Sequence, residues 1–416
     1  MQRGLIGYPL GHSYSKLIHE QLADYTFEIN ELAPENFDQF MKEKDFISIN
    51  VTIPYKQEVI PYLDSLDEKA KKIGAVNTIE NKDGKLIGYN TDYYGFWWML
   101  TNNNIHIKNK KVAILGNGGA TQACKVVIHD MDAKECLIIS RTESDTTITY
   151  EELFKNHYDV EVLINATPVG MQPKHDDSPI DLSKLKNLES VVDIIYNPGK
   201  TKLVLQAESL GITAIGGLEM LVAQAKQAVE IFTGKLLDDE VIKRITNNIQ
   251  RQKENIVFIG MPSSGKTTLA KMVSDIYHMP FIDLDEEIVR KASKTIPEIF
   301  ALDGEATFRD IESSCVLDVC MKEGCVISTG GGVIKREKNI EHLKKKGYLI
   351  WLDRDVSLLQ YNGDRPLVKN ADEVKKLYEE RLPLYQKYCD VKFDNNGTVD
   401  ESINKLKQLL ESRKIK

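Results

Sequence analysis

The sequence predicts an α/β protein built from parallel sheets, with at least two nucleotide-binding domains. Glycine-rich loops begin at Gly116 and Gly260, and each follows a short β-branched run, residues 111–115 and 255–259. A segment with helical periodicity follows each loop, which is the strand–loop–helix unit of a parallel sheet. The chain has 416 residues, enough for two to four domains at about 150 residues each.

Composition and charge exclude several classes of protein. The chain is 42% hydrophobic and 28% charged, and it contains no apolar run near the roughly 18 residues of a membrane-spanning helix. It begins with a strand-like run and not with a signal peptide, so we expect a cytoplasmic protein. A net charge of −8 disfavours nucleic acid as a partner. The spacing of Cys315, Cys320 and Cys325 is too wide for a zinc site and predicts free, mostly buried thiols.

Polar segments divide the chain into three expected lobes. Asparagines at 102–104 precede the first glycine loop, and a charged stretch precedes the second. We find no fixed-period repeat. The predicted organisation is a first lobe at 1–101 with 217–245 packing back on it, a second lobe at 102–216, a linker at 246–254 and a last domain at 255–416.

The first glycine loop predicts a Rossmann-like dinucleotide lobe. Small residues at a strand-to-helix turn let the backbone approach a pyrophosphate, and the helix N-terminus supplies N–H donors. The next strand ends in Arg141 and two hydroxyls, where an NAD site usually carries a carboxylate. A guanidinium suits a 2′-phosphate, so NADP is preferred over NAD; the alternative is a solvated arginine at a strand end. The predicted cofactor residues are Gly116, Gly118, Gly119, Ala120, Ser140, Arg141 and Thr142.

Polar side chains gather at expected strand ends and turns of the first lobe. They comprise hydroxyls, amides, the lysine Lys56 and the aspartate Asp92. Such a set suits a hydroxylated, neutral or anionic substrate and one proton transfer, and it contains no evident metal ligands.

Seven stretches of this region resemble the shikimate dehydrogenase family, over essentially residues 1–245. They are residues 7–15, 50–56, 74–78, 88–92, 165–171, 193–198 and 217–225. The resemblance implies reduction of 3-dehydroshikimate to shikimate with NADPH. Lys16 and Glu20 depart from the family, where proline and asparagine are usual, and both could alter substrate affinity.

The resemblance also implies roles for individual residues. Lys56 and Asp92 carry out the chemistry, because an ammonium beside a carboxylate can protonate the alkoxide that develops as hydride arrives. Met171 and Gly217 lie near the nicotinamide. The implied substrate-binding residues are Ser13, Ser15, Thr52, Asn77, Asp92, Tyr196 and Gln224.

The second glycine loop matches the phosphate-binding pattern G-x-x-x-x-G-K-[ST] without a mismatch. Its backbone N–H groups cradle phosphates, Lys266 neutralises them and Thr267 can ligate magnesium. Asp283 and Asp285 end the next strand two residues apart, so we expect both to leave the same face; one can serve magnesium and the other a substrate hydroxyl. The predicted nucleotide-binding residues are Gly260, Ser263, Ser264, Gly265, Lys266, Thr267 and Thr268.

Residues 255–390 resemble the shikimate kinase family, a P-loop α/β fold of the NMP-kinase type. The resemblance rests on the loop, on residues 329–332 and on three arginines, and it implies transfer of the γ-phosphate of ATP to a shikimate hydroxyl. Asp283 is then the magnesium residue with Thr267, and Asp285 faces the accepting hydroxyl. Residues 358–361 offer no basic adenine contact. Arg309, Gly331 and Arg381 hold the substrate, and Arg365 contacts the nucleotide and stabilises the transferring phosphoryl group.

Both halves thus point to one small molecule, as product of the first and acceptor of the second. One alternative is a quinate-accepting dehydrogenase fused to another small-molecule kinase, of the gluconate type. A second is a module that senses shikimate without turnover, although a sensor needs neither Lys56 nor Asp283. The sequence assigns no oligomeric state and no relative orientation of the halves.

Overall fold

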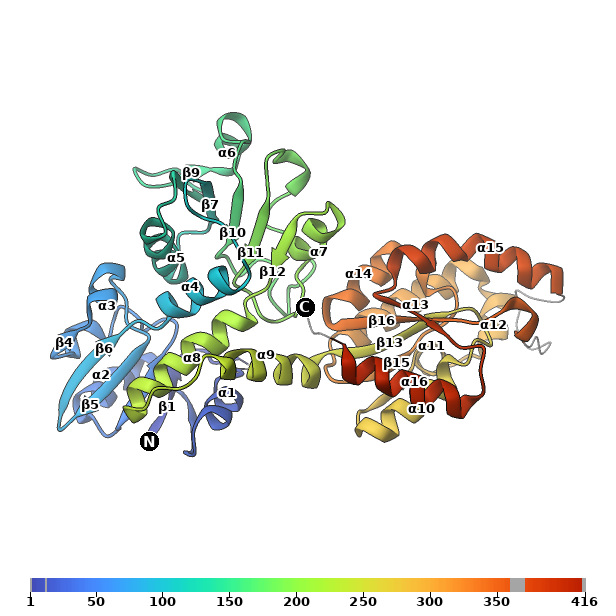
Figure 1. Ribbon diagram of the computed structural model, residues 1–416, viewed down its shortest axis with the longest axis horizontal. Helices are drawn as coiled ribbons and strands as arrows, with labels where there is room; N and C mark the ends of the chain where they lie inside the picture. Colours follow the sequence, from blue (N-terminus) through green and yellow to red (C-terminus); the bar gives the residue numbers. More distant parts are fainter. Residues whose placement is uncertain (1, 12, 360–370, 414–416) are drawn as a thin grey trace. The chain divides into compact units, whose positions relative to one another are not determined.

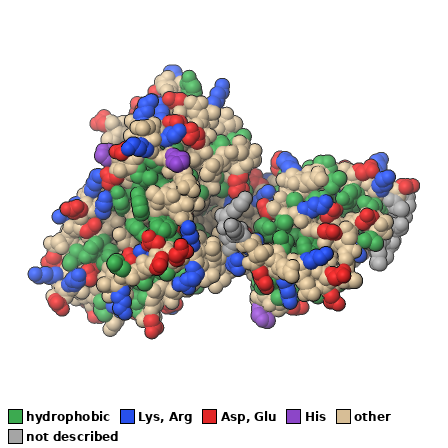
Figure 2. Space-filling model, in the orientation of Figure 1, with side chains coloured by type: hydrophobic (Ala, Val, Ile, Leu, Met, Phe, Trp, Pro, Cys, Tyr) green, Lys and Arg blue, Asp and Glu red, His purple; other side chains and the backbone are tan. Residues whose placement is uncertain are grey.

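The computed structural model describes residues 2–11, 13–359 and 371–413. The chain forms two compact units, Met1–Asn248 and Ile249–Lys416, with three mixed or parallel sheets covered by helices (Figure 1). This confirms the predicted α/β class. Among the described residues, no helix is both long enough and apolar enough to cross a bilayer. In Figure 2, acidic and basic side chains are interspersed over the visible face of each unit.

The first unit begins with a lobe built on a six-stranded sheet of order β2-β1-β3-β5-β6-β4. Strand β1 pairs in parallel with β2 and β3, and β5 runs antiparallel to both β3 and β6. The central strand β3 is buried along its whole length, including its polar residues Ser48 and Asn50. The strands are β1 (Arg3–Gly7), β2 (Glu28–Glu31), β3 (Ser48–Val51), β4 (Ser65–Leu66), β5 (Thr78–Lys82) and β6 (Lys85–Tyr89), with helices α1 (Ser15–Leu22), α2 (Pro34–Glu43) and α3 (Glu68–Ile73).

The second lobe of this unit is a doubly wound parallel sheet of order β12-β11-β10-β7-β8-β9. The chain starts at β7, winds outward through β8, and then crosses to β10, so the switch point lies between β7 and β10. Ligands bind at such a point, beyond the carboxyl ends of the strands. The elements are β7 (Lys111–Leu115), α5 (Gly119–Asp130), β8 (Glu135–Ser140), β9 (Ile148–Thr149), α6 (Tyr150–Asn156), β10 (Val162–Asn165), β11 (Ser190–Asp193), α7 (Lys202–Ser209) and β12 (Thr213–Ile215).

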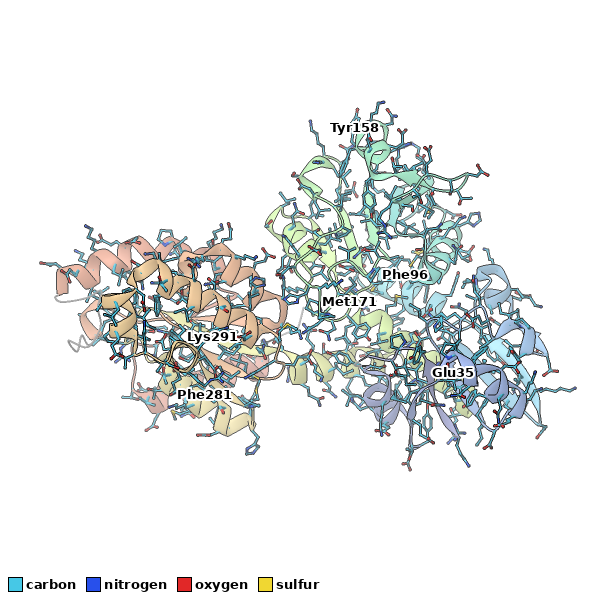
Figure 3. The ribbon with its side chains drawn as sticks, turned by 180° about the vertical axis from the view of Figure 1, so that it is seen from behind. Glu35, Phe96, Tyr158, Met171, Phe281 and Lys291 are labelled. Carbon is cyan, nitrogen blue, oxygen red and sulfur yellow. The ribbon has the colours of Figure 1, made fainter. Side chains whose placement is uncertain are left out.

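Two helices join these lobes. Helix α4 (Asp92–Asn102) leaves the first lobe and α8 (Leu218–Thr233) returns to it, and the two helices pack against each other. Their backbones are in close contact, because a Cβ atom at Gly95 would lie 2.6 Å from the Met220 carbonyl oxygen. Phe96 of α4 is fully buried in the core beneath the second sheet (Figure 3).

The second unit is a five-stranded parallel sheet of order β14-β15-β13-β16-β17. Its central strand β13 is buried at every residue, as expected for a parallel sheet with helices on both faces. The elements are β13 (Asn255–Gly260), α10 (Lys266–Tyr277), β14 (Phe281–Asp283), α11 (Leu284–Ala292), α12 (Ile296–Leu302), α13 (Gly304–Cys320), β15 (Val326–Ser328), α14 (Glu337–Lys346), β16 (Gly347–Asp353), α15 (Ala371–Tyr388), β17 (Val391–Asp394) and α16 (Val399–Ser412).

The segment 246–254, predicted as a linker, is helical almost to its end. It belongs to α9 (Glu240–Lys253), and the boundary between the two units falls within it. Ile242, Ile245 and Ile249 are fully buried, and their i, i+3, i+7 spacing forms one apolar stripe. The helix was not predicted from the sequence, because polar residues surround this apolar stripe. None of the six cysteines forms a disulfide, and four of them are buried.

Candidate active sites

Lys56 and Asp92, predicted as partners, form an ion pair in the first unit. Lys56 Nζ lies 2.6 Å from Asp92 Oδ2, and the two side chains are 19% and 14% exposed. Asp92 is the first residue of α4, where the helix dipole favours a carboxylate. Its backbone N–H donates to Asn90 Oδ1 at 3.1 Å. The pair therefore presents an ammonium, partly shielded from water and held by a fixed carboxylate, which is a competent proton donor.

Asn77 and Gln224, from different elements, meet through Thr91. The Asn77 amide donates to Thr91 Oγ1 at 3.0 Å, and the Thr91 hydroxyl lies 3.2 Å from Gln224 Oε1, to which it can donate. The Thr91 backbone N–H also donates to Asn77 Oδ1 at 2.8 Å. Thr91 received no role in the sequence analysis, although its place between Asn90 and Asp92 put it in the polar set.

The two predicted serines also lie together. Ser13 Oγ donates to Ser15 Oγ at 3.0 Å, at the start of α1. Between them, the ring of Tyr14 lies 5.3 Å from the ring of Tyr196, which comes from the second lobe. Burial raises the pKa of Tyr196, so this phenol stays protonated and can donate a hydrogen bond at neutral pH.

Thr52 follows β3 and packs against the end of β1. A Cβ atom at Gly7 would lie 2.4 Å from Thr52 Cγ2, so Gly7 makes room for the threonine. Thr52 N donates to the Ile6 carbonyl at 2.9 Å, which fixes this turn beside the first strand.

The glycine loop after β7 has the shape of a phosphate cradle. Gly116 has φ of 99°, a conformation that side chains other than glycine rarely adopt. Cβ atoms at Gly118 and Gly119 would meet nothing within 4 Å, and Gly119 begins α5. The loop thus leaves open space in front of a helix N-terminus, which fits a pyrophosphate.

The other predicted dinucleotide residues lie at the ends of strands in the same lobe. Arg141 and Thr142 are exposed just after β8, and Thr142 N donates to Ser140 Oγ at 3.4 Å. Met171 is 44% exposed (Figure 3). Gly217 caps α8, and a Cβ there would lie 2.0 Å from the Ile194 carbonyl oxygen, so only glycine fits at the contact between α8 and the end of β11.

A buried carboxyl group that the sequence analysis missed organises this contact. Asp193, fully buried at the end of β11, accepts from Thr201 Oγ1 at 2.6 Å, from Ile195 N at 3.1 Å and from Asn165 Nδ2 at 3.1 Å. These bonds hold the turn that carries Tyr196. Burial outweighs them and raises the pKa of Asp193 to about 6.

This raised pKa predicts a pH-dependent stability. The ordinary pKa of this carboxyl group is 3.8. Between pH 4 and 6, the folded chain therefore keeps a proton on Asp193 that the unfolded chain releases. Stability therefore falls as pH rises through this window, by about 3 kcal/mol. The free energy of unfolding of Asp193→Asn, measured by denaturant unfolding of the full chain, should lack this dependence on pH. Relative to wild type, the variant should therefore be more stable at pH 7.5 than at pH 4.5. Equal slopes in both proteins would contradict the assignment.

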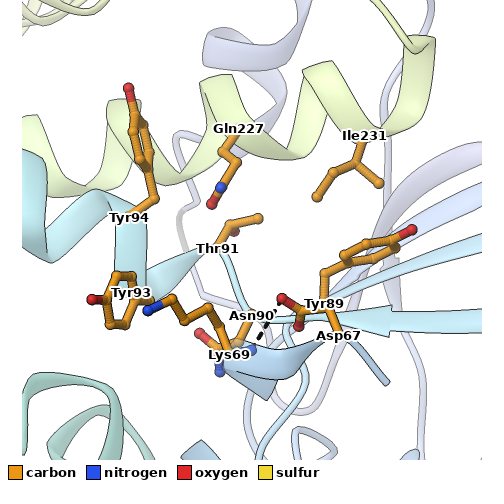
Figure 4. A pocket seen from close by; sticks show the side chains of 9 residues that line it. All are labelled: Asp67, Lys69, Tyr89, Asn90, Thr91, Tyr93, Tyr94, Gln227 and Ile231. Carbon is orange, nitrogen blue, oxygen red and sulfur yellow. Dashed lines mark hydrogen bonds between the residues drawn. The ribbon is translucent and has the colours of Figure 1, made fainter. Parts of the chain in front are cut away.

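A small cavity, of about 160 Å³, borders the Lys56–Asp92 site and shares Asn90 and Thr91 with it. Figure 4 shows its wall of tyrosines and polar groups. The Lys69 ammonium lies 3.9 Å from the centre of the Tyr93 ring, and Asp67 accepts from the first N–H groups of α3. The charged groups of this cavity are thus already paired within the fold. The nine lining residues are Asp67, Lys69, Tyr89, Asn90, Thr91, Tyr93, Tyr94, Gln227 and Ile231.

In the second unit, the loop after β13 forms a phosphate-binding turn. Gly260, Ser263 and Gly265 have φ values of 149°, 63° and 92°, which turn the backbone around a central space. Lys266, the first residue of α10, donates to the carbonyls of Gly260 and Met261 at 3.1 and 2.8 Å. The loop therefore holds its cation where phosphate oxygens would lie.

Thr267 and Asp283, the predicted magnesium residues, lie together. Thr267 Oγ1 donates to Asp283 Oδ2 at 3.0 Å and lies 3.1 Å from Ser328 Oγ. Hydroxyl and carboxylate oxygens are the ligands that Mg²⁺ prefers, so this group fits the ion. Ser328, at the end of β15, was not predicted.

The prediction that Asp283 and Asp285 share one strand face is wrong. Asp283 ends β14, and its side chain accepts from the backbone N–H groups of Asp285 and Glu286. It is therefore the N-cap of α11, which places Asp285 in the first helical turn. Asp285 lies beside Gly330, because a Cβ atom at Gly330 would lie 2.8 Å from Asp285 Oδ1.

The two described arginines of the predicted substrate site are buried. Arg309 is 7% exposed and Arg381 2%. Arg381 Nη1 donates to the Gly331 carbonyl at 2.8 Å, and Arg309 Nη1 donates to Glu312 Oε2 at 2.8 Å. Glu312 was missed, although it lies one helical turn after Arg309. Arg365 and residues 360–361 lie outside the described residues.

Comparison with known proteins supports the division into two units. A family model described as the shikimate dehydrogenase substrate binding domain matches residues 5–79, and the shikimate kinase model matches residues 262–411.

Relatives of known name match the first part of the chain. The NADP(+) shikimate dehydrogenase of Clostridium beijerinckii is 42% identical over 255 residues, which cover 57% of this chain and 94% of that protein. Among solved structures, a chorismate mutase/shikimate 5-dehydrogenase fusion protein from Clostridium acetobutylicum is 36% identical, with a TM-score of 0.57, and the match covers 60% of this chain and 96% of that one. Shikimate 5-dehydrogenase from Thermus thermophilus, solved with NADP(H) and shikimate, is 27% identical with a TM-score of 0.54, over 60% and 99% of the two chains. This chain therefore belongs to the shikimate dehydrogenase family and carries a shikimate kinase domain in its C-terminal unit, which makes it a fusion of an oxidoreductase and a kinase.

Proposed function

We propose that the first unit reduces 3-dehydroshikimate to shikimate with NADPH and that the second phosphorylates shikimate with MgATP. The observation that carries the first half is the 2.6 Å contact between Lys56 and Asp92. The observation that carries the second half is that one phosphate-binding loop brings together the cation of Lys266 and two oxygen ligands for magnesium, from Thr267 and Asp283.

In the reduction, a bound dinucleotide would supply the hydride to the substrate carbonyl carbon. Lys56 donates a proton to the oxygen that becomes negative, and Asp92 holds the ammonium in place and stabilises its charge. Ser13, Ser15 and Thr52 offer hydroxyls to the ring, and Asn77 and Gln224, linked through Thr91, offer amides. The Tyr196 phenol closes the site from the second lobe.

For the dinucleotide, we propose that the pyrophosphate lies at Gly116–Ala120, before helix α5, and the adenosine 2′-phosphate at Arg141. Gly118 and Gly119 leave open space for the pyrophosphate. Arg141, with Ser140 and Thr142 beside it, is exposed where a phosphate can reach it. Met171 and Gly217 would border the nicotinamide.

Arg141→Ala should raise the KM for NADPH by about 10- to 100-fold, because one charge-assisted contact to the phosphate contributes about 1.5–3 kcal/mol. The KM for NADH, which lacks this phosphate, should stay unchanged. Lys155→Ala, which removes an exposed cation of α6 in the same lobe, serves as control. If Arg141→Ala weakened both dinucleotides equally, the 2′-phosphate would not lie there.

In the phosphoryl transfer, Lys266 and the loop N–H groups hold the phosphates, while Thr267 and Asp283 hold the magnesium ion. Asp285 would accept the proton of the attacking hydroxyl. Arg309 and Arg381 suit an acceptor with a carboxylate, since a guanidinium binds such a group bidentately. Arg365 is proposed to stabilise the transferring group.

The alternative substrates can be excluded by direct assay of the full chain. NADPH oxidation with 3-dehydroshikimate is compared with NADP⁺ reduction by quinate, and ADP release with shikimate is compared with ADP release with gluconate. We expect activity with 3-dehydroshikimate and shikimate to exceed the others clearly. Preference for quinate or gluconate would overturn the substrate assignment, and binding of shikimate without turnover would indicate a sensing module.

A further inference from the structure

A carboxylate outside the predicted site joins the two helices that connect the lobes of the first unit. Glu219 lies in the first turn of α8, and its two oxygens accept hydrogen bonds from the side-chain amides of Asn102 and Asn103. These asparagines end α4. We call this group, Glu219 with Asn102 and Asn103, the clasp.

The two helices that the clasp joins carry both sides of the proposed reaction. Helix α4 begins with Asp92, and α8 bears Gln224 after its cap at Gly217. The backbone of Gly217 is in close contact with the Ile194 carbonyl group of the dinucleotide lobe. The spacing between α4 and α8 therefore sets the distance from the proton donor to the hydride donor.

The contacts that hold this spacing include one near each end of α4, besides the core that the two helices share. Near Asp92, Gly95 lets the backbones touch, since a Cβ there would lie 2.6 Å from Met220 O and 2.9 Å from Gln224 Cβ. At the other end of α4, the clasp joins the two helices through hydrogen bonds to a charged acceptor, which are stronger than hydrogen bonds between neutral groups.

We infer that Glu219 is a positioning residue that holds α4 and α8 as one rigid block, and thereby fixes Asp92 and Lys56 opposite the nicotinamide. This inference rests on the proposed dehydrogenase function. Hydride transfer depends steeply on alignment, and a displacement of about 1 Å can cost about 100-fold in rate. Loss of the clasp should permit a smaller shift than that, because the Gly95 contact remains.

The test is single-turnover hydride transfer in the full chain, followed as the loss of NADPH absorbance after mixing with 3-dehydroshikimate. We expect Glu219→Ala to slow this step about tenfold, with the dissociation constant for NADPH and the kinase activity of the same sample unchanged. Glu219→Gln, which keeps one acceptor oxygen, should fall between Glu219→Ala and wild type. Glu208→Ala, which removes an exposed carboxylate of α7 bound to Lys200, is the matched control and should behave as wild type.

A second measurement does not depend on catalysis. Spin labels at Asp83 and Lys186, exposed positions in the two lobes, report the distance between them, and we expect a broader distribution in Glu219→Ala than in wild type. Unchanged distance and unchanged hydride transfer in that variant would refute the inference. Absence of hydride transfer in wild type would instead refute the proposed function. Loss of NADPH binding or of the thermal transition in both Glu219 variants would show a role in folding alone, and would also overturn the inference.

Discussion

Lys56→Ala should abolish the reductase activity and leave the kinase intact. Without the ammonium, the oxygen that becomes negative during hydride transfer has no proton donor, and Asp92 is left as an unpaired carboxylate at 14% exposure. General acid catalysis of this kind contributes about 100- to 10,000-fold, so kcat for NADPH oxidation should fall within that range. ADP release with shikimate should continue at the wild-type rate.

The control for this prediction is Lys71→Ala, which removes an exposed lysine of α3 in the same lobe. It should change neither activity. If Lys56→Ala kept more than a tenth of the wild-type kcat, another group would be the proton donor. If it also silenced the kinase, the two units would not act as independent catalysts.

Lys266→Ala should silence phosphorylation by a comparable factor. Lys266 is 8% exposed and lies within hydrogen-bond distance of the loop carbonyls of Gly260 and Met261. Its charge is therefore fixed where negative charge develops on the phosphates. Removing a preorganised group of this kind costs about 100- to 1,000-fold in rate, which a coupled ADP-release assay with shikimate measures directly.

Lys271→Ala is the matched control, because this lysine lies in the same helix but is exposed. It should retain full kinase activity, and both variants should oxidise NADPH as wild type does. Persistent phosphorylation in Lys266→Ala would mean that the loop of β13 does not bind the transferred phosphate.

The sequence predicted the fold class because glycine loops and buried strands have strong local patterns. The loops at Gly116 and Gly260 both lie between a parallel strand and a helix, as predicted. Helix α9 was missed because only three isoleucines in fourteen residues carry its apolar stripe. Asp285 was misplaced because Asp283 caps a helix that begins at Leu284, whereas the strand was predicted to continue to Asp285.

The residues of the candidate sites also divide into those that the sequence predicted and those that it did not. The Lys56–Asp92 and Thr267–Asp283 pairs were predicted, since the stretches that contain them resemble the two families. Thr91, Asp193, Glu219 and Glu312 were not, because each is recognised only by its hydrogen bonds to other side chains in the folded chain. Asp193 and Glu312 are fully buried polar residues, and neither the burial nor the partner of such a residue is visible before the chain is folded.

We propose that the two nucleotide-binding loops serve one hydroxylated ring acid in succession. The most direct measurement supplies the full chain with 3-dehydroshikimate, NADPH and MgATP together, and follows NADPH, ADP and products by absorbance and mass spectrometry. We expect one ADP for each NADPH oxidised, a phosphorylated shikimate as the final product, and no ADP in a parallel reaction from which NADPH is left out. Oxidation of NADPH with accumulation of unphosphorylated shikimate, or release of ADP without prior reduction, would contradict the account.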